Sequence, residues 1–105
     1  MHQVTFGFTL TGALEDVQVF ANGVPVQCFP TGSSKFSGGF LNARIADNSE
    51  LVIHFHLTGS NGTAYSIEYQ FLDNGTKEED NNKPSPVTGR IRTNNEKAER
   101  IRFKA

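Results

Sequence analysis

The chain has 105 residues and carries 10 Lys and Arg against 11 Asp and Glu, a formal net charge of −1, which suits one globular domain spanning 1–105. Its apolar content is enough for a packed core and excludes a disordered chain, and no apolar run approaches the roughly 20 residues of a membrane helix. A secretion signal is not visible at the start. We therefore expect a soluble domain, and its one cysteine, Cys28, excludes an internal disulfide and is compatible with the cytoplasm.

Hydrophobic residues alternate with polar ones along most of the chain, a period of two that is typical of half-buried strands. No stretch keeps the spacing of an amphipathic helix. Two polar stretches, 30–39 and 73–86, are expected to be connections, and the second, without an apolar residue, is expected to be mobile. The predicted strands are 4–10, 17–21, 24–28, 41–45, 51–57, 65–71, 87–93 and 99–104.

The pair Asn22-Gly23 predicts a hairpin, because both residues tolerate the positive φ angles of a type I′ turn. Pro25 lacks a backbone donor, so the returning strand is expected at a sheet edge or with this position turned away from the ladder. A two-residue turn would pair Ala21 with Val24, Val19 with Val26, and Val17 with Cys28.

About eight short antiparallel strands in one domain of this length predict an all-β fold. The expected architecture is a β-sandwich of immunoglobulin-like or jelly-roll type, with a small β-barrel as the alternative.

A metal site is the first functional candidate. His54 and His56 alternate with apolar residues and therefore project together from the outer face of one strand. If that strand pairs with 65–71, Glu68 lies opposite one of the histidines. Two imidazoles and a carboxylate are a ligand set for zinc or non-haem iron. The alternative is a solvent-facing His–Glu pair across two strands.

The polar stretch 73–82 offers oxygen ligands to calcium, although the ligand order of an EF-hand is absent and a solvated linker is the favoured interpretation. The oxygen-bearing side chains are those of Asp73, Asn74, Glu78, Glu79, Asp80, Asn81 and Asn82.

Positive charge is concentrated toward the C-terminus. Residues 1–72 carry two basic side chains against five acidic ones, whereas residues 73–105 carry eight against six. Basic residues alternate there with Ile91, Ile101 and Phe103, so they are expected on an outer face. This predicted cationic face consists of Arg90, Arg92, Arg100, Arg102 and Lys104.

A hairpin of the last two strands would place Arg90 opposite Arg102 and Arg92 opposite Arg100, which is unfavourable for like charges. The acidic stretch 78–80, a different strand order or an external anion would offset this repulsion. We favour a Greek-key topology that separates the two strands and pairs the arginines with local carboxylates.

No nucleophile elbow, carboxylate pair or nucleotide-binding glycine pattern is present, so the sequence favours a non-catalytic protein. We expect a recognition module that binds an acidic partner through the cationic face or assembles through sheet edges, with itself or with another protein. Nucleic acid is not the expected partner, because Phe103 points inward and leaves no stacking platform. The alternatives are the metal site and carbohydrate binding through polar loops.

Overall fold

The computed structural model of the protein describes residues 1–40 and 42–105. Leu41, the first residue of the strand expected at 41–45, is not among the described residues. The fold is all-β, as predicted, with 68% of the chain in strands. Among the described residues, none lies in an apolar helix of membrane-spanning length. The strands are β1 (His2–Thr11), β2 (Asp16–Ala21), β3 (Val24–Gly32), β4 (Lys35–Ile45), β5 (Glu50–Thr58), β6 (Ala64–Asp73), β7 (Thr76–Glu78), β8 (Val87–Arg90) and β9 (Glu96–Lys104).

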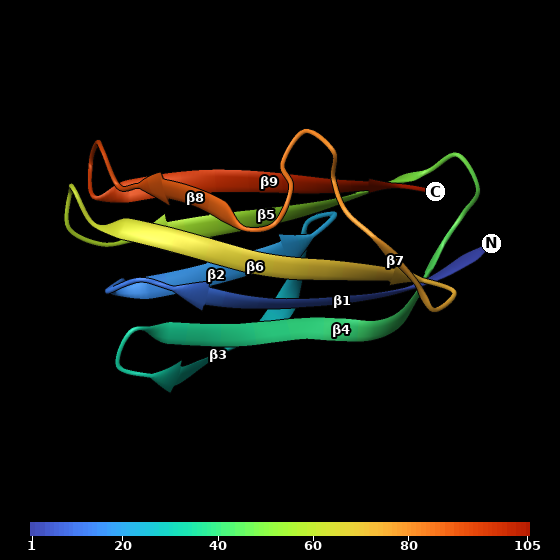
Figure 1. The fold of residues 1–105 in the computed structure, drawn as a ribbon, viewed down its shortest axis with the longest axis horizontal. Coiled ribbons are helices and arrows are strands. Elements are labelled where there is room, and N and C mark those ends of the chain that lie inside the picture. The colour runs from blue at the N-terminus through green and yellow to red at the C-terminus, as the bar shows by residue number, and fades with distance from the viewer.

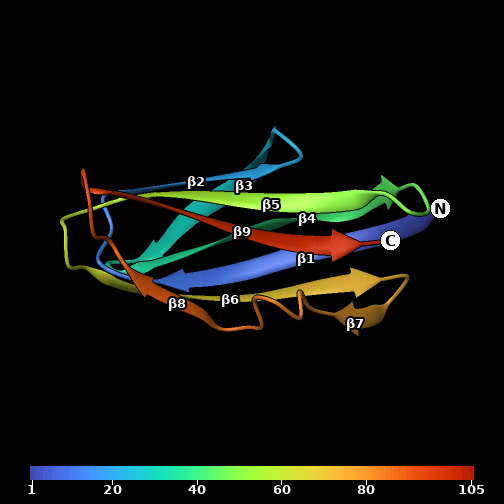
Figure 2. The ribbon, with the colours of Figure 1, turned by 90° about the horizontal axis from the view of Figure 1, so that it is seen from above.

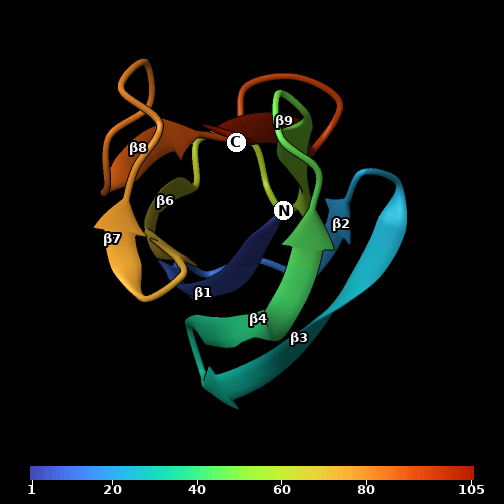
Figure 3. The ribbon, with the colours of Figure 1, turned by 90° about the vertical axis from the view of Figure 1, so that its right-hand side faces the viewer.

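The strands form one antiparallel sheet that is nearly closed into a barrel (Figures 1 and 3). Their order is β7-β6-β1-β4-β3-β2-β5-β9, and β8 makes a further pair with β6. This arrangement agrees with the small barrel that the sequence offered as the alternative. The ends of the sheet, β7 with β8 on one side and β9 on the other, face each other without a continuous ladder between them.

The core lies inside the curved sheet and is formed by the apolar residues that alternate with polar ones in the sequence. In β1, β5 and β6, every second side chain is buried, and the largest fully buried ones are Phe6, Phe55 and Phe71. Their rings pack at centroid separations of 5.2 Å for Phe6 and Phe71 and 6.4 Å for Phe6 and Phe55. Aromatic packing between the neighbouring strands β1 and β6, and between β1 and the distant strand β5, therefore contributes to the stability of the core.

The predicted hairpin is present, with φ angles of 47° at Asn22 and 84° at Gly23. Val19 pairs with Val26 and Ala21 with Val24, as expected, although Val24 at the turn is 64% exposed. The expected pairing of Val17 with Cys28 is wrong, because β3 leaves β2 after Val26 and pairs with β4 from Gln27 onward.

The expected loop at 30–39 is also a correction. Most of this stretch is strand, with β3 running to Gly32 and β4 starting at Lys35. Because the stretch is rich in small residues, the sequence shows no alternation of apolar and polar side chains there. The ladder between β3 and β4 nevertheless requires a small residue, because a Cβ on Gly38 would lie 1.8 Å from the carbonyl oxygen of Gln27. Glycine at this position lets the two strands approach each other closely.

The assumed pairing of 51–57 with 65–71 is wrong, and the hairpin of the last two strands, which we had not favoured, is absent. β5 lies between β2 and β9, so it does not pair with β6, which lies between β1 and the short strands β7 and β8. Likewise β8 pairs with β6 while β9 pairs with β5. The last two strands are therefore separated, as we favoured, and Arg102 pairs with the local carboxylate of Glu50.

The gap between β6 and β9, which we call the seam, is bridged by residues 79–86 of the polar stretch. The Asp80 carboxylate accepts a hydrogen bond from the backbone N–H of Arg102 at 2.9 Å, as a neighbouring strand would. The Tyr69 hydroxyl donates to the Lys83 carbonyl at 2.6 Å and accepts from the Asp80 N–H at 2.9 Å. Polar contacts, rather than apolar packing, thus fasten this segment, and its mobility stays a prediction.

At the centre of the seam lies Glu99, which is 6% exposed and the only buried charged residue in the described part of the chain. Its carboxylate accepts hydrogen bonds from the Tyr65 hydroxyl and from Lys83 Nζ, the latter at 2.6 Å. Both carboxylate oxygens are therefore paired, as a buried carboxylate requires.

Candidate functional site

Three strands bring the strongest candidate site together on the outer face of the barrel. β2, β5 and β9 lie side by side (Figure 2), and their ladders place Phe20 opposite His54 and His54 opposite Arg100. The hairpin turn closes one side of the resulting cavity of about 430 Å³, which we call the outer hollow. Its lining residues are Phe20, Asn22, Gly23, Val52, His54, His56 and Arg100.

The lining of the outer hollow includes one permanently charged side chain, the guanidinium of Arg100. Among the described residues, no carboxylate forms an ion pair with Arg100. Burial, together with the nearby Arg100 guanidinium and His56, lowers the pKa of His54 below its usual value. His56 has an acidic neighbour, because its Nε2 lies 3.0 Å from a carboxylate oxygen of Glu96.

The structure does not bring the predicted metal ligands together. His54 and His56 project outward from β5 as expected, but Glu68 lies on β6 opposite Thr9 of β1. The predicted proximity fails because consecutive strands β5 and β6 occupy different places in the sheet. No group of three metal-ligating side chains lies within ligand distance anywhere in 1–40 and 42–105.

The predicted cationic face divides into two parts. Arg100, Arg102 and Lys104 share the outer side of β9, whereas Arg90 belongs to β8 and Arg92 to the segment after it. Arg90 Nη1 donates to the carbonyl of Gly62 at 2.9 Å. The ladders do not place Arg90 opposite Arg102 or Arg92 opposite Arg100, as a hairpin of the last two strands would have done, because β8 pairs with β6.

Of the β9 residues, Arg102 has an acidic neighbour: its Nε lies 3.2 Å from a Glu50 carboxylate oxygen, and both side chains are about half exposed. Arg102 and Lys104 also border the acidic stretch 78–80. Arg100 is thus the arginine of this row that is left for an external anion.

The oxygens considered for calcium serve the chain's own backbone. The second Asp80 oxygen accepts from the Asn82 N–H at 2.9 Å, and a Glu79 oxygen accepts from the Ser85 N–H at 2.6 Å. These bonds shape the segment over the seam, and calcium binding stays a prediction.

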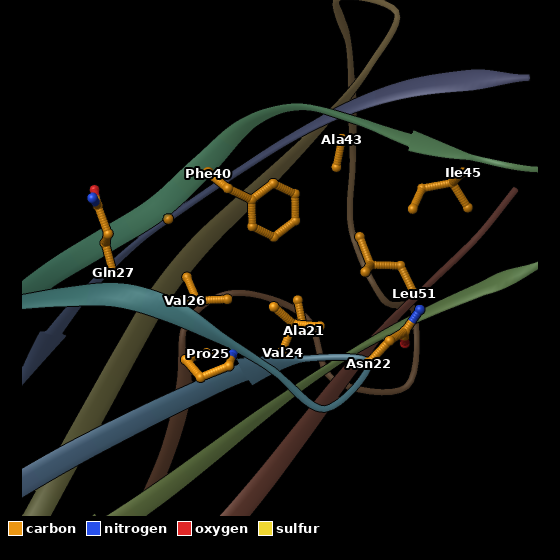
Figure 4. Close-up of a pocket in the computed structure, with 11 residues that line it drawn as sticks. Ala21, Asn22, Val24, Pro25, Val26, Gln27, Phe40, Ala43, Ile45 and Leu51 are labelled. Carbon is orange, nitrogen blue, oxygen red and sulfur yellow. The ribbon is translucent and has the colours of Figure 1, made fainter.

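A second concave site, which we call the slot, opens through the wall between β3 and β4 (Figure 4). Beyond the pair of Gln27 with Gly39, the described residues of β4 pair only with β1, and the first residues of β3 pair only with β2. The slot has a volume of about 420 Å³. The apolar side chains directed into it are Ala21, Val26, Phe40, Ala43, Ile45 and Leu51.

Sequence reasoning missed Phe20 and the slot. Val17, Val19 and Ala21 are the alternate residues that point inward, so Phe20, between two of them, points outward. This large apolar side chain on the outer face is the signal that could have identified the site. The slot left no such signal, because it arises where two strands diverge.

These features define an all-β protein with an antiparallel sheet nearly closed into a barrel, an outer hollow lined by Arg100 and an apolar slot. Comparison of the chain with protein-family models, with curated proteins and with solved structures finds no match.

Proposed function

We propose that the protein is a non-catalytic recognition module that binds an acidic partner through the outer face of β2, β5 and β9. The observation that carries the proposal is the unpaired guanidinium of Arg100 in the outer hollow. Arg102 and Lys104 continue the row of basic side chains along β9, although Glu50 and the acidic stretch 78–80 offset part of their charge. Such a row attracts an acidic surface over a distance comparable to the Debye length and fixes its orientation on contact.

The proposal does not depend on the finer description of the fold. In an immunoglobulin-like or jelly-roll sandwich, which remains our finer hypothesis, the same three strands would form one exposed sheet face.

Binding of polyglutamate, followed by isothermal titration calorimetry at low and high ionic strength, tests the proposal. The triple variant Arg100→Ser, Arg102→Ser, Lys104→Ser should lose most of the binding, while the control Arg90→Ser, Arg92→Ser should keep it. Equal affinity of the triple variant and the unchanged protein would show that the β9 row is not the contact.

The slot supports a second candidate function, the addition of a strand from another copy of this chain. Unpaired strand edges with apolar side chains between them favour pairing with an extended segment. An acidic side chain in the slot, Ala43→Glu, should then abolish self-association in sedimentation velocity, whereas Ala98→Glu on the exposed face of β9 should not. A protein that stays monomeric at all concentrations excludes this function.

A further inference from the structure

We infer that the outer hollow binds a single carboxylate group attached to an aromatic or other compact apolar body. This inference rests on the proposed function, because it names the chemical group that the acidic partner presents at this place. It unites residues that sequence reasoning had assigned to separate sites, the histidines to a metal and Arg100 to a charged face.

Arg100 would bind the charged end of the ligand. A guanidinium presents a planar fork of N–H donors that matches the two oxygens of a carboxylate. Arg100 lies directly across the ladder from His54, and both side chains line the hollow. A carboxylate bound there would contact Arg100 first and His54 second.

Phe20 and Val52 line the same hollow and would contact the apolar end of the ligand. The Phe20 ring stands edge-on to His54, with the ring centroids 6.3 Å apart. The volume of about 430 Å³ falls within the range of sites for small ligands. A purely polar anion would leave this apolar surface uncovered.

The rim of the hollow is already in place without a ligand. The Asn22 side chain accepts a hydrogen bond from the Val52 N–H at 2.8 Å and donates one to the Glu50 carbonyl at 3.2 Å. These bonds tie the hairpin turn to β5, so the binding of a ligand does not have to order it.

The imidazole of His54 should make binding depend on pH. The titratable and charged groups near it are Arg100 from β9 and His56 from β5, whose Nε2 lies 3.0 Å from a carboxylate oxygen of Glu96 on β9, and Phe20 from β2 is apolar. Because these neighbours and burial lower its pKa, His54 is neutral at pH 7 and gains a positive charge on acidification. A carboxylate should therefore bind more tightly as the pH falls, until the ligand itself is protonated near pH 4.

The test uses benzoate, with benzamide as its neutral counterpart, titrated into the full chain and followed by NMR. We expect benzoate to shift the His54 signals and to bind about tenfold more tightly than benzamide. The variant Arg100→Gln should reduce benzoate affinity by about tenfold, while the control Arg92→Gln should not change it. Equal affinities for benzoate and benzamide, or an unchanged affinity in Arg100→Gln, would overturn the inference.

The pH dependence gives an independent readout. Saturating benzoate should raise the pKa of His54, by linkage, and leave the His2 signals in place. His54→Gln should remove the increase in affinity between pH 7 and pH 5. An identical increase in this variant would exclude the role of His54.

The two proposals fail separately. If polyglutamate binds along the β9 row and benzoate does not bind, the inference on the outer hollow is wrong and the proposed function stands. If benzoate binds in the outer hollow and polyglutamate does not bind, the hollow is a small-molecule site and the acidic macromolecular partner is excluded.

Discussion

The burial of Glu99 illustrates how far single residues can be interpreted. Glu99 has the same strand parity as Ile101 and Phe103, so its inward orientation follows from the alternation that the sequence displays. Its partners do not follow, because Tyr65 and Lys83 reach it from β6 and from the segment over the seam. A carboxylate in this position needs both of them, since an unpaired buried charge is costly.

Removing the lysine should therefore destabilise the fold. Lys83→Met leaves Glu99 with the Tyr65 hydroxyl alone, and we expect the free energy of unfolding to decrease by about 1–3 kcal/mol in urea denaturation. The Lys83 side chain is 41% exposed, so solvent screening keeps the loss at the lower end of that range. The exposed Lys35→Met serves as the control, and equal effects in the two variants would contradict this account.

His54 should also make stability depend on pH. Its pKa is below the ordinary 6.5 in the folded protein, so the unfolded chain takes up this proton first. The free energy of unfolding should therefore decrease as the pH falls from about 6.5 through the lowered pKa of His54. His54→Gln should reduce this decrease in urea denaturation at pH 7 and pH 5. A slope unchanged by the substitution would mean that His54 is not the responsible group.

At the scale of the elements, the sequence predicts strands better than it predicts their partners. The core side of β1, β5 and β6 follows from alternation, and the β2–β3 turn follows from Asn22-Gly23. The partners of β5 did not follow, because nothing local to a strand records which distant strand lies beside it. The predicted proximity of Glu68 to the two histidines was wrong for the same reason, because it depended on an assumed pairing of β5 with β6, and metal binding itself stays a prediction.

The β3–β4 contact provides a sharp test at this scale. In Gly38→Ala the new methyl group would lie 1.8 Å from the Gln27 carbonyl oxygen, so one strand has to move and its hydrogen bonds are lost. We expect a loss of more than about 2 kcal/mol in the free energy of unfolding. Gly7→Ala is the matched control, because no atom lies within 4 Å of its new methyl group. Similar stability of the two variants would refute the close approach.

At the scale of the whole molecule, the two ends of the nearly closed sheet are joined by a different kind of contact from the ladders between its strands. Backbone ladders join every neighbouring pair in the strand order, while side chains of residues 79–86 join the two ends of the sheet. The binding surfaces depend on this global arrangement: the outer hollow needs β2, β5 and β9 in that order, and the slot needs β3 to diverge from β4.

The seam should make the molecule sensitive to alkali. Burial raises the pKa of Tyr69 to about 12, and burial and the nearby Glu99 also raise the pKa of Tyr65. Above pH 10 the unfolded chain loses these phenolic protons while the folded protein keeps them, so the free energy of unfolding should decrease from pH 10 toward pH 12. Tyr69→Phe should reduce that decrease, as measured by urea denaturation at pH 9 and pH 11. The idea fails if both proteins lose stability equally.

The order of the strands also has a consequence for how quickly the chain can fold. The β2–β3 hairpin joins neighbouring residues, and such hairpins form within about 1–10 μs. The ladder of β1 with β6 runs from Thr11 opposite Ser66 to Val4 opposite Asp73, so about half of the chain has to be looped before its first contact forms. Folding should therefore take milliseconds to seconds, and closure of the barrel, rather than formation of its hairpins, should set the rate.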